Sequence, residues 1–424
     1  MKLLRKRNLF CLCLFFVFLC GELQTVFAAF RPFCSVNEIS HSEQRGEEIV
    51  PGGLYSYASC LMDAENDRVL FERHGNEQLP MASTTKIMTL IVILEHASMG
   101  DIVTVSKNAA AQPDVQLNIR EGEKYRLGDL VYSLMLESHN DVAVALAEHV
   151  GGSVEEFALL MNAKAAAMGL THTHFVTPNG LDADEHYTTA VELSKIASYA
   201  IKNPDFLKIT NTANYQFNEI TTGRSFSVTN KNRFLYLMDG AIGVKTGFTG
   251  KAGYCFVGAL KRGDHTLIAT MLACGWPPNK TYKWSDTRKL MEHGLTHFKK
   301  LSFAERATLI VNGNKEETSG FDLQKVQIVL PVTGGIAESV DAAADEMAVA
   351  PLLLAEWEQP RIEVSYEEGL SAPVTEGQIV GFVTYAIDEE EYASCFIRTK
   401  KAVPKIDFWY CLYQVLGKWK SGDF

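Results

Sequence analysis

The sequence lacks the residue patterns that indicate a metal centre or a redox-active dithiol. Its nine cysteines include no CxxC pair. His172 and His174 form an HxH, and His293 and His297 lie four residues apart, but neither pair has a glutamate in the HExxH arrangement. We therefore interpret these histidines as surface or packing residues, and we expect neither a metal ion nor a cofactor.

Positive charge is also scarce. The 424 residues include 40 Lys and Arg against 51 Asp and Glu, which gives a net charge of -11 and argues against a nucleic-acid partner. Hydrophobic residues make up 47% and charged residues 21% of the chain, so we expect a folded protein with a large core, long enough for two domains. Internal repeats and low-complexity tracts are absent.

The chain has no apolar run of membrane-spanning length at its beginning. Basic residues between Lys2 and Arg7 precede a short apolar run from Leu9 to Leu19, and "TVFAAF" follows, with Val26 and Ala28 at the small-residue positions before a cut near Ala28. This pattern predicts a signal peptide over residues 1–28, and therefore an exported protein. A retained membrane anchor is the alternative, but the run is short for a span. The polar stretch 29–50 reads as a linker.

Six cysteines follow the predicted cleavage site, namely Cys34, Cys60, Cys255, Cys274, Cys395 and Cys411. An exported chain could pair them. However, Cys60, Cys255 and Cys274 each lie in an apolar, strand-like run, where a buried free thiol is the more common state.

The order of the predicted elements indicates an α+β domain over residues 51–300. Two strands around a turn at Asn66-Asp67 come first, helices dominate residues 125–210, and successive strands run from "FLYLMDG" to "MLAC" before a closing helix. A mixed sheet with helices packed on it follows from this order. Short strands separated by Gly, Pro and Glu then predict a small β domain over residues 301–400.

Residues 401–424 predict an aromatic-rich amphipathic helix. Its apolar side chains fall within an arc of roughly 120°, and they are Phe408, Trp409, Leu412, Val415, Leu416 and Trp419. Asp407, Gln414 and Lys418 lie on the opposite side. Such a helix at a chain end is typical of a membrane interface, and docking on the β domain is the alternative.

The stretch "MASTTKIMT" contains the first candidate for chemistry. Ser83 precedes Lys86 by three residues at the start of a buried helix, with Ser83 or Thr84 as the expected N-cap, so the two side chains share a face. A serine hydroxyl needs a base to become a good nucleophile. A lysine can be that base only if burial or a nearby positive charge lowers its pKa.

Two further elements accompany this pair. "ESHND" places Ser138 and Asn140 in a turn before a helix, where they could relay a proton and hold an amide. "GVKTGFTG" places Lys245, Thr246 and Gly247 on a strand, where a cation and a hydroxyl suit a carboxylate. A glycine there lets a ligand lie against the backbone, and the strand edge can pair with a peptide.

Together, S-x-x-K, S-x-N and K-T-G resemble the motif set of penicillin-binding proteins and β-lactamases. The stretches "LPMASTTKIMT", "NDVAVALAEHVGGS", "MGLTHTHFVTPNGLD" and "GVKTGFTGKAGYCFVGA" resemble the serine D-alanyl-D-alanine carboxypeptidases of the cell envelope, over most of residues 54–300. That family also has a following β domain and an amphipathic C-terminal anchor. The implied fold is a β-lactamase/transpeptidase-like α+β domain, an all-β domain and a terminal helix.

The resemblance implies a role for each motif residue. Ser83 would be the acylated nucleophile and Lys86 its general base, while Ser138 and Asn140 would move a proton and position the peptide. Lys245 and Thr246 would bind the terminal carboxylate of D-Ala-D-Ala, Lys245 would also help to keep Lys86 neutral, and the backbone amides of Ser83 and Phe248 would form the oxyanion hole. We assign the substrate-binding strand to Lys245, Thr246, Gly247, Phe248 and Thr249.

The resemblance also implies partners and a location. Peptidoglycan stem peptides would be the substrates, β-lactams would be covalent inhibitors, and the terminal helix would hold the protein at the outer face of the cytoplasmic membrane. Two motif residues depart from many relatives. We interpret His139 as a tolerated spacer, and Phe248 replaces a histidine found in some relatives.

Rival functions share some of these groups. A class A β-lactamase needs a glutamate for deacylation, and the run "EEFALLMN" has the wrong spacing for that element. A D,D-endopeptidase could use the same groups. A non-catalytic peptidoglycan-binding protein is the alternative from another class, although every reactive group is present.

Overall fold

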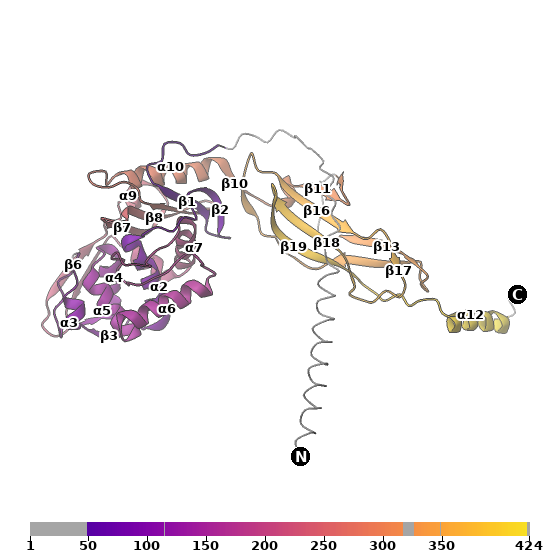
Figure 1. Ribbon diagram of the computed structural model, residues 1–424, viewed down its shortest axis with the longest axis horizontal. Coiled ribbons are helices and arrows are strands. Elements are labelled where there is room, and N and C mark those ends of the chain that lie inside the picture. Colours follow the sequence, from indigo (N-terminus) through magenta and orange to yellow (C-terminus); the bar gives the residue numbers. More distant parts are fainter. Residues whose placement is uncertain (1–48, 114, 317–325, 348, 422–424) are drawn as a thin grey trace, which may run out of the picture. The chain divides into compact units, whose positions relative to one another are not determined.

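A computed structural model describes residues 49–113, 115–316, 326–347 and 349–421 (Figure 1). The predicted signal peptide, Cys34 and nearly all of the predicted linker lie outside the described residues. Helix and strand labels follow Figure 1.

A five-stranded antiparallel sheet is the base of the first part of the chain. Its strand order is β2-β1-β9-β8-β7, so the strands come from both ends of this part, as predicted. The strands are β1 (Ala58–Asp63), β2 (Arg68–Arg73), β7 (Ala241–Thr249), β8 (Gly253–Arg262) and β9 (His265–Leu272). The β1–β2 connection contains Asn66 and Asp67, which confirms the predicted turn.

Both faces of this sheet are buried. Successive side chains on a strand point to opposite sides, so each strand contributes to the cores on both faces. On β1, Cys60 and Met62 join a core formed with α2 and α7, whereas Leu61 joins a second core with Leu290 on α10. Figure 1 shows α10 beside this sheet. Two-sided burial explains why every β1 residue is buried. It also explains why the run reads as continuously apolar rather than alternating.

Helices fill the segment between β2 and β7. They are α2 (Lys86–His96), α3 (Lys107–Ala110), α4 (Leu127–Leu136), α5 (Asn140–Gly151), α6 (Val154–Ala167), α7 (Ala190–Ile201), α8 (Pro204–Thr210) and α9 (Phe234–Leu237), and α10 (Tyr282–His297) follows β9. Two small hairpins lie among them, β3 (Ile102–Thr104) with β4 (Lys124–Arg126) and β5 (Asn214–Asn218) with β6 (Ser225–Thr229). The "FLYL" stretch was predicted as strand and is the short helix α9, in which Phe234 is buried against Phe256 whereas Tyr236 and Leu237 are exposed.

The second part of the chain is rich in β-strands. An eight-stranded sheet has the order β12-β11-β16-β18-β19-β14-β13-β17, and β10 (Phe298–Leu301) pairs with β15 (Leu352–Ala355). The sheet strands are β11 (Thr308–Val311), β12 (Asn314–Glu316), β13 (Gln327–Thr333), β14 (Ser339–Ala344), β16 (Pro360–Tyr366), β17 (Leu370–Ser371), β18 (Ile379–Ile387) and β19 (Glu390–Thr399). Helix α11 (Phe303–Arg306) precedes them. This sheet has its own buried core.

The chain ends in α12 (Phe408–Ser421), so the predicted terminal helix is present. Its aromatic side chains are largely exposed, with 76% of Trp419 and 71% of Phe408 accessible. Within the described ranges, no helix combines the length and apolarity needed to cross a membrane.

Candidate active site

Ser83 lies in a 3₁₀ turn, η1 (Ala82–Thr85), that leads directly into α2. The predicted N-cap was therefore wrong by one or two residues. The residue before α2 is Thr85, whose side chain does not cap the helix, and its hydroxyl donates instead to the Ala82 carbonyl at 2.8 Å. The 3₁₀ turn sets Ser83 in the turn that immediately precedes Lys86.

Lys86 is fully buried, and its amine lies at the centre of the site. Nζ is 3.1 Å from Ser83 Oγ, 2.9 Å from Asn140 Oδ1 and within hydrogen-bond distance of the Asn179 carbonyl. Burial lowers the pKa of Lys86 well below its usual value, Lys245 lowers it further, and Asp141 opposes the shift. A neutral Lys86 amine can accept the Ser83 proton.

Ser138 and Asn140 belong to the turn between α4 and α5, and the Asn140 side chain contacts Lys86. Ser138 has a φ of 73°, and its Oγ is buried without a hydrogen-bond partner among the described residues. Asn140 is fixed from three sides: its amide donates to the Val115 carbonyl at 2.7 Å, its Nδ2 donates to the Pro113 carbonyl at 3.2 Å, and its Oδ1 accepts from Lys86. The turn therefore brings the Asn140 side chain of the S-x-N motif to the lysine, with Ser138 two residues before it.

Lys245 lies on β7 and is 2% exposed. Its Nζ donates to the Thr246 carbonyl at 3.0 Å. Burial, and then the charge of Lys283, lower its pKa to about 7. Among the described residues, no carboxylate forms an ion pair with Lys245, so this buried amine is a fitting partner for an anionic ligand.

The remaining residues of the β7 motif lie at the same edge. Gly247 runs close to η1, because a Cβ added there would lie 2.9 Å from the Ser83 backbone nitrogen. The need for glycine thus arises from the close packing of β7 on the nucleophile turn, whereas the sequence suggested room for a ligand. Phe248 is 43% exposed and stacks on Tyr254, and Thr249 Oγ1 donates to Asp182 at 2.8 Å.

Two contributors to the site were missed by the sequence reasoning. The Asn179 carbonyl accepts from Lys86 and from Ser83 Oγ, and Gly180 has a φ of 82° that permits this turn. The dipeptide Asn179-Gly180 is itself a turn signal. Lys283, on the first turn of α10, lies 4.5 Å from the centre of the Tyr254 ring and acts electrostatically on Lys245. A lysine beside aromatic residues gives little sequence signal.

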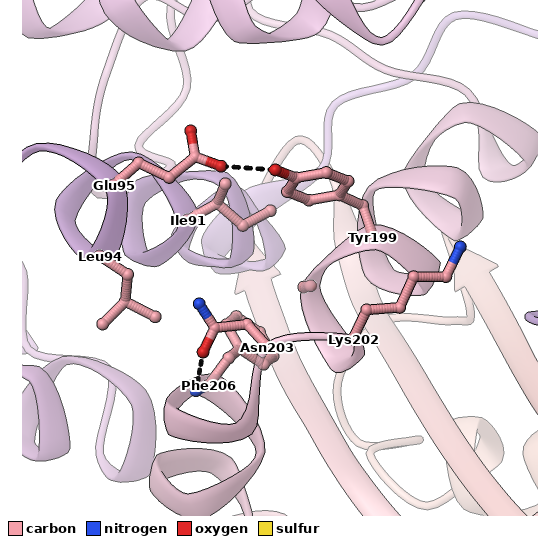
Figure 2. A pocket seen from close by; sticks show the side chains of 8 residues that line it. Ile91, Leu94, Glu95, Tyr199, Lys202, Asn203 and Phe206 are labelled. Carbon is pink, nitrogen blue, oxygen red and sulfur yellow. Dashed lines mark hydrogen bonds between the residues drawn. The ribbon is translucent and has the colours of Figure 1, made fainter.

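A separate hollow of about 220 Å³ lies between α2, α7 and α8 (Figure 2). Its rim carries Glu95, which accepts hydrogen bonds from Tyr199 at 2.7 Å and Lys164 at 2.6 Å. None of the motif residues lines it. The chemistry therefore belongs to the cluster around Lys86, not to this hollow.

The other candidate residues from the sequence lie elsewhere. Cys60, Cys255 and Cys274 are buried free thiols, as predicted. His293 and His297 pack with Trp357 in an aromatic cluster. In the part of the chain that the structure describes, no group of three or more His, Cys, Asp or Glu is arranged to hold a metal ion.

Comparison with known proteins identifies the family. The D-alanyl-D-alanine carboxypeptidase family, peptidase S11, matches residues 48–274. D-alanyl-D-alanine carboxypeptidase DacF of Bacillus subtilis is 27% identical over 85% of this chain and 89% of its own length. D-alanyl-D-alanine carboxypeptidase DacC of Escherichia coli is 30% identical over 78% of this chain and 80% of its own length.

Solved structures agree on the fold. The D-alanyl-D-alanine carboxypeptidase DacD of Francisella tularensis superposes with a TM-score of 0.67 at 22% identity, covering 88% of this chain and all of that one. Penicillin-binding protein 5 of Haemophilus influenzae superposes with a TM-score of 0.63 at 24% identity, covering 84% of this chain and all of that one. The predicted transpeptidase-like domain with a following β-rich part and terminal helix is confirmed. The chain belongs to peptidase family S11, the serine D-alanyl-D-alanine carboxypeptidases.

Proposed function

We propose that this D-Ala-D-Ala carboxypeptidase works through an acyl-enzyme on Ser83, with neutral Lys86 as the base. Lys86 takes the hydroxyl proton while Ser83 Oγ attacks the carbonyl carbon of the penultimate D-alanine. The bond to the last residue breaks, D-alanine leaves with a proton, and water then hydrolyses the ester. The observation that carries this proposal is the 3.1 Å contact between a fully buried lysine amine and the serine hydroxyl.

Ser138 and Asn140 support the proton transfers in this proposal. A hydroxyl is both donor and acceptor, so Ser138 can pass a proton between Lys86 and the leaving amine. Asn140 orients Lys86 through its Oδ1 and leaves the lysine placed for Ser83. The backbone amides of Ser83 and Phe248 are proposed to stabilise the tetrahedral oxyanion.

The substrate proposed for this site is a peptidoglycan stem pentapeptide. Its terminal carboxylate would bind at Lys245 and Thr246, with Lys283 adding positive charge from behind Lys245. The peptide would lie along the edge of β7 that includes Gly247, Phe248 and Thr249. β-Lactams imitate the terminal dipeptide, so we expect them to acylate Ser83 and to leave slowly.

We further propose that the protein acts at the outer face of the cytoplasmic membrane. A signal peptide over residues 1–28 and a linker over 29–50 would precede a catalytic domain over 51–300. The β domain over 301–400 would separate that domain from the lipid surface. The exposed aromatic side chains of α12 support the assignment of residues 401–424 as a helix that binds the membrane interface.

D-Alanine release tests the catalytic proposal directly. We expect residues 29–424 to release D-alanine from an acylated Lys-D-Ala-D-Ala peptide, and the Ser83→Ala variant to release none above the uncatalysed rate. A labelled penicillin should modify the wild type at Ser83, as shown by mass spectrometry of the digested adduct. Release that persists in Ser83→Ala would refute the assignment of the nucleophile.

A further inference from the structure

His139 is a buried side chain of the catalytic turn for which the reaction above gives no task. It is 4% exposed, and its Nδ1 lies 2.7 Å from Ser133 Oγ on α4. Its Nε2 lies 3.4 Å from Glu137 Oε2. Since a carboxylate can only accept, the tautomer that suits Glu137 has its proton on Nε2, and Nδ1 is then the acceptor for the Ser133 hydroxyl. A neutral imidazole thus connects the last turn of α4 with the residue before Ser138.

Glu137 extends this connection to a third segment. Its Oε1 accepts from the Thr229 amide at 3.1 Å and from Lys231 Nζ at 2.9 Å, and the Lys231 amide donates to the Leu136 carbonyl at 3.0 Å. The turn before α5 is therefore tied both to α4 and to the chain that follows β6. Glu137 and His139 are the side chains that make these ties.

The conformation of Ser138 explains why such ties matter. Ser138 adopts a φ of 73°, a left-handed conformation that is strained for a residue with a Cβ. Its hydroxyl has no hydrogen-bond partner among the described residues. The direction of this hydroxyl is therefore set by the neighbouring residues. Asn140 is held by its own bonds to Pro113 and Val115, and the two residues that flank Ser138, Glu137 and His139, make the remaining contacts of the turn.

Burial favours the neutral form of His139. It lowers the pKa of the imidazole below the usual value, although Asp141 and Glu137 oppose the shift; Lys86 and Lys231 add to it less strongly. A protonated ring would place a second N–H against Ser133 and add a cation near Lys86. The neutral ring suits both neighbours.

We propose that His139 is a positioning residue, which clamps the turn between Ser133 and Glu137 and so aims the Ser138 hydroxyl at the Lys86–Ser83 pair. This proposal is an alternative to the interpretation of His139 as a spacer. The inference rests on the proposed roles of Ser83, Lys86 and Ser138. Loss of the clamp would misdirect the proton relay without removing any group that touches the substrate.

The test is a double-mutant cycle on the mature full-length chain, read as the limiting rate of acylation by a fluorescent penicillin per titrated active site. We expect His139→Gly to lower that rate by about 10- to 100-fold, since misplaced catalytic groups cost rate. The penicillin concentration at half-maximal rate should change little. His139→Gln, whose amide can still donate to Glu137, should recover part of the loss.

In the Ser138→Ala background, His139→Gly should cost no more than about twofold, because the group that it positions is already gone. His293→Gln is the matched control: His293 is similarly buried, at 7% exposed, and lies on α10 away from the turn. It should lower the melting temperature and leave the acylation rate unchanged. Should the glycine variant fail to fold, Glu137→Gln serves instead and should lower the limiting rate in the same way.

Two results would overturn the inference. One is an acylation rate for His139→Gly within about twofold of the wild-type rate, because so small a change would mean that His139 is not coupled to the catalytic groups. The other is a loss that is equally large with and without the Ser138 hydroxyl, which would mean a general structural role. A wild type that is not acylated at Ser83 would refute the proposed reaction itself, and this inference with it.

Discussion

At the scale of single residues, the chemistry depends on the desolvation of the Lys86 amine. A charged ammonium loses much of its hydration when it is buried, so burial favours the neutral amine. Here the side chain is completely enclosed, and the positive charge of Lys245 acts in the same direction. Asn140 and Asn179 supply oxygen acceptors for the amine without supplying a negative charge. The site therefore holds the lysine in place with neutral acceptors, and the opposing effect of Asp141 is smaller than that of burial.

Lys86→Arg tests this account of the base. A guanidinium remains charged and cannot accept a proton at any working pH. We expect the acylation rate to fall by about 10²- to 10⁴-fold, the usual contribution of a general base. Circular dichroism should show an unchanged fold, and penicillin acylation kinetics give the rate. A variant with more than about a tenth of wild-type activity would contradict this account.

His186 predicts a pH dependence of stability. Its Nδ1 accepts from the Val176 amide at 3.0 Å, and its Nε2 lies 2.9 Å from Thr85 Oγ1, next to the nucleophile turn. Burial, aided by His174, lowers its pKa to about 4. The unfolded chain binds the proton near pH 6.5, so this residue's contribution to stability is complete above that pH and is lost as the pH falls toward 4.

The loss expected from His186 is about 3 kcal/mol. Urea denaturation at pH 7.5 and pH 4.5 measures it, and His186→Gln should flatten the difference by roughly that amount. An unchanged pH dependence in the variant would show that His186 does not titrate as described.

At the scale of elements, the site is the meeting point of η1 with β7, the α4–α5 turn and the 176–186 loop. β7 packs closely on η1 at Gly247, where an added Cβ would lie 2.9 Å from the Ser83 backbone nitrogen. We expect Gly247→Ala to displace Ser83 and to lower the acylation rate by about 100-fold, since small misplacements of reacting groups are costly. Stopped-flow acylation and a crystal structure of the variant would measure both effects.

Gly250→Ala is the matched control for Gly247→Ala. No atom lies within 4 Å of a Cβ added at Gly250, three residues along the same segment. Its acylation rate should stay within about twofold of the wild type, as for an independent site. Equal losses in both variants would mean that the segment is sensitive for a reason other than the contact with η1.

The elements of the site were largely predictable, because their signals are local. Helical spacing from Ile87 to Leu94 predicted α2, and the apolar runs predicted β7 to β9. The α9 helix and the Asn179 carbonyl were not predictable. The first is a short apolar stretch whose conformation depends on packing, and the second acts through its backbone, which any residue type provides. The ends of α2 shifted because a 3₁₀ turn precedes the helix.

At the scale of the whole molecule, α12 predicts membrane binding. We expect Trp409→Glu with Trp419→Glu to abolish co-sedimentation with phospholipid vesicles, because charged side chains oppose insertion into the interface. D-Alanine release from a soluble peptide should be unchanged. Gln414→Glu adds a charge on the opposite face and should bind vesicles much like the wild type. Vesicle binding that survives the double substitution would favour a helix that docks on protein.

Fewer of the strands and pairings were predicted from the sequence in the second part of the chain than in the first. Four of its strands were predicted from apolar runs, namely those at β11, β13, β16 and β18. β14 was missed because Ser339 and Asp341 interrupt its apolar residues, and β19 because it begins with two glutamates and its apolar residues are interrupted by Ser394. The pairing order β16-β18-β19-β14 joins residues far apart in sequence, and composition carries no information on such pairing.

The pH dependence of acylation tests the central claim most directly. Pre-steady-state acylation of Ser83 by penicillin should increase with pH along a limb that ends well below pH 10.4, the ordinary pKa of a lysine, because Lys86 is already neutral there. A plateau through neutral and mildly alkaline pH is therefore predicted. A rate that increases only near pH 10 would contradict the account, because it would show that Lys86 stays charged in the folded enzyme.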